Sequence, residues 1–467
     1  MKLKILNLGG LNTYINPLIK NDGDLLTCVN MDSYPYGAKT KRQGYTTFLG
    51  TANGSAVTDL FSWEKNNGAL NVYRVSGQKL FSSTEGTGAF TQTANGTLSN
   101  NKVGYAVLDD TMIMGDGVGS TRHTTDGTSF TDTVLAPKGE FFAQYQNRIY
   151  IGGTSSTTFY STTNDATNWA LSGTSDSSSF TVPGAGKMGQ IFKANDRLVM
   201  TKTSKLIYRY DGYNLVDTST FLGPSSPYSV AQAEGYFMWL NQKGIFGYGG
   251  DKPQLLSNAI ERQIYNRSGS AIAGATFGTA PATTHRYDYL LAAGTVTDDF
   301  TGQTVKNAII KYNFQKNEFL NYSFYNNPTA LHSFINTDGN EKLIFGASNG
   351  QVYELESGNT DNGQPIEATM EFVVHLGSPE LDKEFRKFYG FFNPGCNAKV
   401  QVALSDTYTR DSKKWIDIGD CVDGICEYQF PQGGNRGKLL FVKIYENSKD
   451  PAFTCYGFAV EGDVVND

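Results

Sequence analysis

The stretch Gln146-Asn147-Arg148-Ile149-Tyr150-Ile151-Gly152 decides the fold of this chain, because its pattern recurs. A polar pair predicts a tight turn, and the apolar run after it, rich in β-branched and aromatic residues, predicts a strand. This order of turn and strand is found between about residues 54 and 360. The strands that follow a turn are 71–75, 111–115, 148–152, 197–200, 236–239, 289–292 and 342–346.

A further strand follows most of these units, and the spacing points to a repeat architecture. The third strands are 79–82, 158–161, 206–210, 245–248, 309–312 and 351–354. The period is irregular, roughly 35 to 55 residues, as in four-stranded propeller blades. A single sheet of this kind cannot cover both of its faces, so blades stack around an axis and protect one another. We therefore predict a β-propeller over residues 54–362 with six or seven blades; unrelated hairpins in a sandwich are the alternative.

Composition also favours an all-β chain. The protein has 467 residues, of which 39% are hydrophobic and 13% aromatic. Such an aromatic content suits pleated surfaces and is too high for a disordered chain. With 51 glycines against 14 prolines, many tight turns set by glycine are expected.

Two segments that flank the repeat do not follow it. Residues 1–53 are predicted to form an extended N-terminal arm with turns, which either adds a strand to a neighbouring sheet or closes the propeller ring. Residues 363–467 contain apolar strands at the spacing of a C-terminal β-sandwich. The predicted organisation is thus arm, propeller and sandwich.

The charge pattern argues against tight binding of nucleic acid. Net charge is −6, and the basic clusters are small. A protein that neutralises phosphates presents a basic footprint instead. We expect Lys39, Lys41 and Arg42, like the other small clusters, to be solvated strand or loop positions.

The five cysteines and the chain start indicate a reducing compartment without a membrane segment. A chain with so large a core has little need of disulfides, and free cysteine behaves as a small buried hydrophobe. The first residues lack the apolar region of a secretory signal, and no later segment is long enough to span a bilayer. The cysteines are Cys28, Cys396, Cys421, Cys426 and Cys455.

Motifs for catalysis are weak, and we predict no enzyme, no cofactor and no metal site. Residues 161–169 and, more faintly, 124–130 resemble the Asp-box turn of propellers, which fixes a hairpin by side-chain hydrogen bonds. A sialidase-like glycosidase is the enzymatic alternative. It would need an arginine cluster and a tyrosine activated by a carboxylate. The four histidines are isolated in sequence, without the spacing of a zinc site.

The flanks carry a resemblance to a known family. The opening Gly9-Gly10-Leu11-Asn12-Thr13, the stretch 25–32 (LLTCVNMD) and the box Lys41-Arg42-Gln43-Gly44-Tyr45 resemble the start of bacteriophage virion proteins with a propeller. The last strand region, 453–458, resembles the final domain of such proteins. The functional type most similar to this chain is the tail nozzle (tail tubular) protein of short-tailed phages.

This resemblance implies a structural role in the virion tail, after assembly in the host cytoplasm. In the family a ring of subunits, usually six, continues the DNA conduit below the portal and adaptor. The ring would contact other tail proteins and let genomic DNA pass without specific binding, helped by a mildly acidic lumen. The candidate assembly contacts are Leu11, Asn12, Arg42, Tyr45 and Arg386.

A receptor- or glycan-binding propeller at the tail periphery is the alternative function. In that case aromatic side chains on rim loops would stack on sugars. The candidates are Trp169, Tyr213 and Tyr228, whose other expected role is packing between blades.

Overall fold

A computed structural model gives the fold. It describes residues 2–14, 20–84, 88–219, 221–233, 235–266, 269–270, 272, 274–298, 302–406, 414–421, 424–433, 435–449 and 453–465. Strands account for 53% of the chain and helices for 3%. Within the described residues, no helix is long and apolar enough to cross a membrane.

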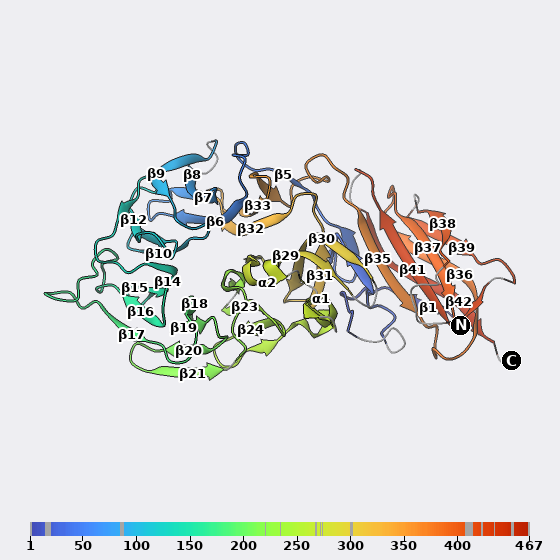
Figure 1. The fold of residues 1–467 in the computed structure, drawn as a ribbon. Coiled ribbons are helices and arrows are strands. Elements are labelled where there is room, and N and C mark those ends of the chain that lie inside the picture. Colours follow the sequence, from blue (N-terminus) through green and yellow to red (C-terminus); the bar gives the residue numbers. More distant parts are fainter. Residues whose placement is uncertain are drawn as a thin grey trace.

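Six four-stranded sheets within the described residues form the blades of a β-propeller (Figure 1). Five of them are continuous in sequence and each runs in order from first to fourth strand. They comprise β6 (Val57–Glu64), β7 (Leu70–Ser76), β8 (Lys79–Thr84) and β9 (Thr91–Thr97); β10 (Gly104–Leu108), β11 (Thr111–Gly115), β12 (Arg122–Thr124) and β13 (Thr131–Asp132); β14 (Gly139–Tyr145), β15 (Arg148–Gly153), β16 (Thr157–Tyr160) and β17 (Ser178–Thr181); β18 (Met188–Ala194), β19 (Arg197–Lys202), β20 (Ile207–Tyr210) and β21 (Leu215–Ser219); and β22 (Ala231–Ala233), β23 (Tyr236–Asn241), β24 (Gly244–Tyr248) and β25 (Gln254–Leu255).

The sixth blade takes its outer strand from the N-terminal segment. Its order is β32 (Pro328–Ile335), β33 (Glu341–Ala347), β34 (Val352–Leu355) and β5 (Tyr45–Thr47). Tyr45 of β5 pairs with Leu355 of β34 in antiparallel register. Of the two roles expected for the N-terminal segment, β5 therefore takes the one that closes the propeller ring.

Four further strands fill the ring between the blade of β22–β25 and the sixth blade. They are β28 (Ala282–His285), β29 (Asp288–Thr297), β30 (Thr304–Asn313) and β31 (Glu318–Tyr322). These strands are not a separate sheet, because β31 pairs with β2 (Thr27–Val29) and so continues into the C-terminal region. The described residues between β25 and β28 form short elements only: η2 (Ser257–Ile260), α1 (Glu261–Ile264), β26 (Tyr265–Asn266), β27 (Gly269–Ser270) and α2 (Gly274–Thr279). A further short helix, η1 (Pro227–Ser229), precedes β22.

The turns that begin the second strands have the geometry that their polar pairs predict. Gln146 and Asn147 both have positive φ, at 47° and 54°, as do Asn195 and Asp196 at 45° and 53°. Positive φ at both central residues defines the type I′ turn, whose twist matches that of a hairpin. Asparagine and aspartate tolerate this region better than other non-glycine residues.

Buried side chains from adjacent sheets meet in separate clusters around the ring. Trp63 and Met112 join the first blade to the second, for example, and Phe192 and Trp239 join the fourth to the fifth. The sixth blade packs on the first through Ile344 and Val72, which closes the ring. Each blade thus buries both faces against its neighbours, and the predicted all-β propeller is confirmed.

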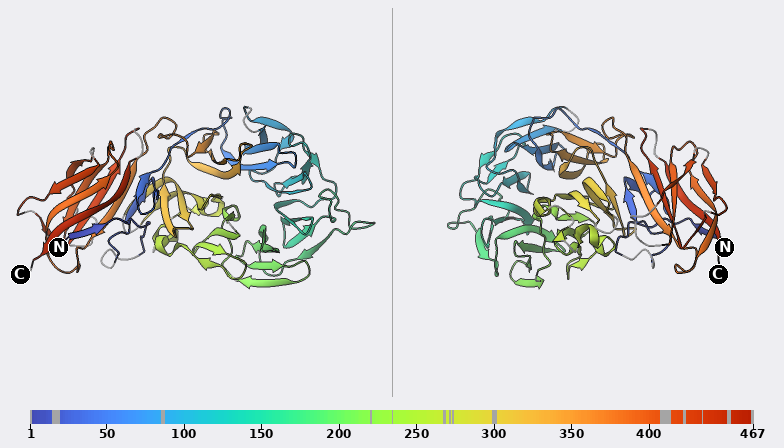
Figure 2. Two further views of the ribbon diagram at one scale, coloured as in Figure 1. Left: turned by 180° about the vertical axis from the view of Figure 1, so that it is seen from behind. Right: turned by 45° about the vertical axis from the view of Figure 1, so that its right-hand side comes forward.

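Beside the propeller lie two large sheets (Figures 1 and 2). A nine-stranded sheet has the order β28-β29-β30-β31-β2-β35-β41-β37-β38. A seven-stranded sheet has the order β3-β4-β42-β36-β39, with β1 on β42 and β40 on β36. The strands not yet given are β1 (Lys2–Ile5), β3 (Met31–Asp32), β4 (Lys39–Lys41), β35 (Ala368–Val374), β36 (Lys383–Phe392), β37 (Lys399–Ser405), β38 (Ile416–Asp420), β39 (Ile425–Gln429), β40 (Arg436–Gly437), β41 (Leu439–Glu446) and β42 (Thr454–Val464).

The two large sheets share one apolar core. Phe372 of the nine-stranded sheet stacks on Phe458 of the seven-stranded sheet, with ring centroids 4.6 Å apart. The same buried cluster continues to Leu291 and Tyr289 in the propeller ring. All five cysteines are buried and unpaired by disulfides, as expected.

Candidate functional sites: a buried ionic anchor and a cavity in the propeller

The basic box of the N-terminal segment is buried, not solvated as expected. Lys39, Lys41 and Arg42 are 0%, 2% and 3% exposed. Lys39 and Lys41 belong to β4, which lies between β3 and β42 in the seven-stranded sheet, and Arg42 directly follows this strand. Buried cations need paired acids and hydrogen bonds, and each of the three has both.

Arg42 is the most completely bonded of the three. Its Nη1 and Nη2 donate to the two carboxylate oxygens of Asp361 at 2.8 and 2.7 Å. Nε donates to Asn30 Oδ1 at 2.8 Å, and Nη2 also donates to the Ser323 carbonyl at 2.8 Å. The guanidinium carbon lies 4.4 Å from the centroid of the Phe324 ring. This bidentate, stacked geometry is one that lysine cannot reproduce.

The two lysines extend the anchor to other parts of the chain. Lys39 Nζ donates to Glu318 of β31 at 2.9 Å. Lys41 Nζ donates to the Glu446 carboxylate at the end of β41 and to the Ser448 carbonyl at 2.8 Å. We call Lys39, Lys41 and Arg42 with their acids Glu318, Glu446 and Asp361 the ionic anchor.

A second buried network lies next to the anchor. Lys311 of β30 donates to Asp32 at 2.6 Å and lies 2.8 Å from the Asp288 carboxylate, while Tyr322 also donates to Asp32 at 2.6 Å. Burial alone would raise the pKa of Asp32, but the Lys311 ammonium and these hydrogen bonds outweigh it and lower the pKa. The carboxylate of the N-terminal segment is therefore held ionised against the propeller ring.

The predicted assembly residues fall into two groups. Leu11 and Tyr45 are buried together with Arg42: the Leu11 amide donates to the Phe319 carbonyl at 3.0 Å, and Tyr45 packs within the sixth blade. Asn12, half-buried, donates to Asp24 at 3.0 Å. These four make contacts within the chain. Arg386 lies at the surface, where it pairs with Asp463.

The Asp-box turns are structural, as predicted. Asp165 Oδ1 accepts hydrogen bonds from the Thr167 amide at 2.8 Å and the Asn168 amide at 3.2 Å. Trp169 is buried and its indole donates to the Ala166 carbonyl at 2.9 Å. Asp126 accepts two backbone hydrogen bonds in the same way, which lower its pKa to about 2 despite some burial. Trp169 is consequently not a rim aromatic.

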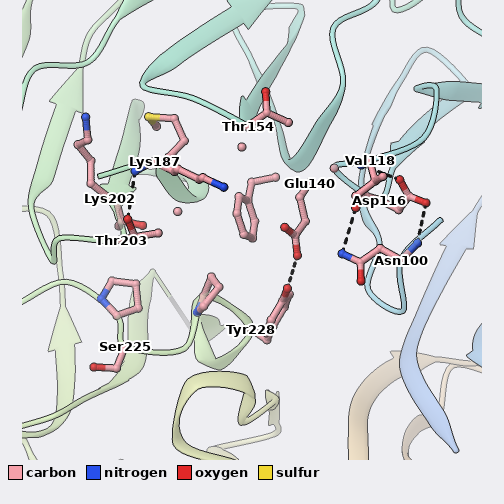
Figure 3. Close-up of a pocket in the computed structure, with 18 of the residues that line it drawn as sticks. Asn100, Asp116, Val118, Glu140, Thr154, Lys187, Lys202, Thr203, Ser225 and Tyr228 are labelled. Carbon is pink, nitrogen blue, oxygen red and sulfur yellow. Dashed lines mark hydrogen bonds between the residues drawn. The ribbon is translucent and has the colours of Figure 1, made fainter. Parts of the chain in front are cut away.

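A cavity of about 340 Å³ opens where the first strands of consecutive blades begin (Figure 3). Its walls come from the blades of β10–β13, β14–β17 and β18–β21 and from η1, which precedes β22. This volume is in the range of small-molecule sites. Cationic and anionic side chains both line it. In Figure 3, Lys187 lies on one side and Asp116 on the other.

Tyr228 and Glu140 meet at the centre of this cavity. The Tyr228 hydroxyl donates to Glu140 Oε1, and the Lys102 ammonium lies 4.8 Å from the centroid of the Tyr228 ring. Burial raises the pKa of Glu140, and the nearby Asp59 carboxylate adds to the rise, whereas the Tyr228 hydrogen bond opposes it. Burial and the Glu140 carboxylate raise the pKa of Tyr228.

The pairing of Tyr228 with Glu140 bears on the alternative that the protein is a sialidase-like glycosidase. Tyr228 beside Glu140 is a tyrosine–carboxylate pair of the kind that a sialidase-like site requires. The cations among the described lining residues are lysines, not an arginine cluster. The described residues also contain no group of three or more His, Cys, Asp or Glu placed to hold a metal ion.

Sequence reasoning missed Glu140 and Lys187 as site residues and treated Tyr228 as a rim aromatic. Glu140 is the second residue of β14, and Lys187 directly precedes β18. The signal that could have found them is position, because the starts of first strands in consecutive blades converge on one face of a propeller.

Comparison with known proteins adds similarity of fold only. No family model matches the chain, and no curated protein matches it. Similar solved structures include the designed Ika8 protein (14% identity, 67% of this chain and 99% of that chain, TM-score 0.40). Another is BamB from Moraxella catarrhalis, with 11% identity over 68% of this chain and 90% of that chain and a TM-score of 0.41. A third is YCF48 from Cyanidioschyzon merolae, with 11% identity over 67% of this chain and 98% of that chain and a TM-score of 0.43. The strand pairing described above defines the chain as a β-propeller protein.

Proposed function

We propose that this protein is a structural subunit of a bacteriophage tail, part of a nozzle or hub ring on the path of the ejected genome. The observation that supports the proposal most is the ionic anchor. The box 41–45, which carries much of the resemblance to tail nozzle proteins, supplies Lys41 and Arg42 to it. These residues tie the start of the chain to the C-terminal sheet and to the propeller.

Mechanical continuity is the physical reason why such an anchor suits a tail. Strand β2 pairs with β35 on one side and β31 on the other, so the propeller ring and the C-terminal strands share one hydrogen-bonded sheet. Because the propeller and the C-terminal strands share this sheet, a mechanical load passes from one to the other without bending at a flexible linker. Neighbouring copies can then be held at fixed angles around a closed ring.

The conduit in this proposal runs between subunits and not through one propeller. Tyr228 precedes the fifth blade and Glu140 belongs to the third, so their hydrogen bond spans the inner face of the fourth. An acidic surface on the ring axis, in keeping with the net charge of −6, would let DNA slide.

Native mass spectrometry and electron microscopy of the purified chain, alone and mixed with the proteins of dissociated tails, test the proposal. We expect a closed ring, with six copies as the leading stoichiometry, either alone or on addition of the tail proteins. Arg386→Glu should weaken the ring without lowering the melting temperature. Lys193→Glu, a surface change within a blade, is the control and should leave the ring intact. The proposal would be refuted if the chain stays monomeric both alone and with the tail proteins, and is absent from virions.

A receptor- or ligand-binding propeller is the second candidate, and the cavity around Tyr228 and Glu140 favours it. Of the three aromatic candidates, Tyr213 is 92% exposed, Tyr228 lines the cavity and Trp169 is buried. The two candidate functions can coexist in one tail protein.

A further inference from the structure

The outer face of the seven-stranded sheet carries a row of exposed apolar side chains. Phe391 of β36 pairs with Ile425 of β39 on one side and with Gly457 of β42 on the other. Leu6, which follows β1, continues this row, because a Cβ at Gly457 would lie 3.0 Å from the Leu6 Cα. Ile425, Leu6 and Tyr456 are 63%, 50% and 43% exposed. We call Leu6, Phe391, Ile425 and Tyr456 the sheet stripe.

The charged residues beside the sheet stripe neutralise one another. Lys387 pairs with Glu427 at 2.9 Å, and Lys2 pairs with Glu461 at 2.8 Å. Arg386, the predicted assembly residue that lies at the surface, belongs to the same strand as Phe391. This face therefore suits an apolar protein surface and not a partner with charge of one sign, such as a nucleic acid.

A second exposed apolar patch lies on the third blade. Leu135 and Leu171 are 71% and 76% exposed and line a cavity of about 290 Å³. The rest of the described lining is uncharged and comprises Pro137, Phe159, Tyr160, Trp169, Ser177 and Ser178. We call this cavity the blade pocket. Its Leu135 has a φ of 64°, a region that costs a leucine backbone energy, and strained residues of this kind gather at binding surfaces.

The sheet stripe and the blade pocket lie at opposite ends of the protein. Figure 1 shows β36, β39 and β42 at one end and β16 and β17 at the other, and Figure 2 shows the same arrangement from behind. One chain cannot bring these surfaces together, whereas a second copy can. A contact of the stripe with itself about a twofold axis would leave the pocket exposed. A head-to-tail contact covers both surfaces, and such contacts close into a ring when the rotation between neighbours allows it.

We propose that the sheet stripe of one copy docks in the blade pocket of the next copy. The inference rests on the ring proposed above and names the two surfaces that build it. Ile425, the most exposed residue of the stripe, contacts Leu135 and Leu171. Because neither surface contains a charged residue among those described, docking buries no unpaired charge.

Disulfide cross-linking between two single variants tests this contact. Ile425→Cys and Leu171→Cys chains are mixed, alone and with the tail proteins, and oxidised with glutathione disulfide, while the five native cysteines are buried. We expect a link between positions 425 and 171 to form about tenfold faster than with the control, because docking raises the local concentration of the two thiols. The matched control replaces Ile425→Cys by Ile335→Cys, since Ile335 of the sixth blade is 61% exposed.

A charge on the stripe tests the contact without cross-linking. Ile425→Asp should raise the dissociation constant of the assembled protein about tenfold or more, because it places a carboxylate in an apolar interface. Ile335→Asp should leave the constant unchanged. Sedimentation measures the assembly, and circular dichroism checks that both variants are folded.

Three outcomes would overturn the inference and leave the ring proposal standing. One is a ring in which positions 425 and 171 link no faster than in the control. Another is a ring whose main link joins two copies of position 425, as in a twofold contact. The third is a ring that Ile425→Asp, folded, does not weaken. A chain that stays monomeric alone and with the tail proteins also overturns the inference, and its presence in or absence from virions then decides the proposed function separately.

Discussion

Arg42 and Asp361 lie 319 residues apart in sequence and share two hydrogen bonds, of 2.8 and 2.7 Å, in the interior of the protein. Arg42 follows the N-terminal strand β4, whereas Asp361 follows the last propeller blade. Both side chains are 2% exposed. The pair thus fixes the point where the N-terminal segment, the propeller and the C-terminal sheets meet.

Removal of one partner of this pair should destabilise the whole chain. Arg42→Met leaves the Asp361 carboxylate buried without its partner, which typically costs about 3–5 kcal/mol. Urea unfolding measures the change in the free energy of unfolding. Arg386→Met, at an exposed ion pair, is the control and should change it by less than about 1 kcal/mol. Equal small effects of the two substitutions would show that the anchor does not hold the chain together.

Gly44 is needed for close packing and not only for a turn. A Cβ at Gly44 would lie 2.0 Å from the Thr360 carbonyl oxygen, a backbone atom that cannot move aside alone. Gly44→Ala should therefore lower the melting temperature and separate β5 from the 358–361 segment. Gly278→Ala, with no atom within 4 Å of the added Cβ, should be neutral or slightly stabilising because alanine favours helix. Differential scanning calorimetry compares them; matching melting temperatures would exclude the predicted clash.

His332 should make stability depend on pH between about 6.5 and 4. Its Nε2 lies 2.8 Å from the Ser62 hydroxyl of the first blade, and burial lowers its pKa to about 4. The unfolded chain takes up this proton near pH 6.5, before the folded chain does, so stability falls as the pH drops through this window. His332→Gln should reduce the loss, as followed by thermal melts at pH 7.5 and 4.5. The control His123→Gln should keep the full loss, and a pH response that His332→Gln does not change would contradict the prediction.

Tyr228 should tune the acidity of Glu140. Tyr228→Phe removes the hydrogen bond that opposes the effect of burial, so the pKa of Glu140 should rise further. A pH titration of the glutamate side-chain carbon resonances by NMR measures the shift. Tyr213→Phe alters a tyrosine that is 92% exposed and should not move it. If the Glu140 titration is the same in both variants, the hydrogen bond is not formed in solution.

The repeat could be read from the sequence because its determinants are local. Polar pairs such as Gln146 and Asn147 specify the turn wherever they stand, and the apolar strand after them specifies a face to bury. The anchor could not be found in this way. The acids that pair with Lys39, Lys41 and Arg42 lie 279, 405 and 319 residues away, so a local pattern reads these cations as solvated.

The cavity was missed for a related reason. Its residues come from three consecutive blades and from the segment around η1, and they are brought together only when the ring closes. Glu140 and Lys187 look like ordinary polar residues at strand starts, and their convergence depends on how the blades are arranged around the axis. The Asp-box turns, in contrast, are contained within nine residues and were predicted with their correct role.

Hydrogen exchange at Leu26 and Asn30, the two residues that flank strand β2, tests the central claim most directly, namely that the N-terminal segment is an internal part of the folded chain. The Leu26 amide donates to the Glu371 carbonyl at 2.7 Å, and the Asn30 amide donates to the Asn321 carbonyl at 2.8 Å. We predict that both amides exchange only through global unfolding, at the rate of the amides of β35. Exchange within seconds, as in an unstructured peptide, would contradict this account.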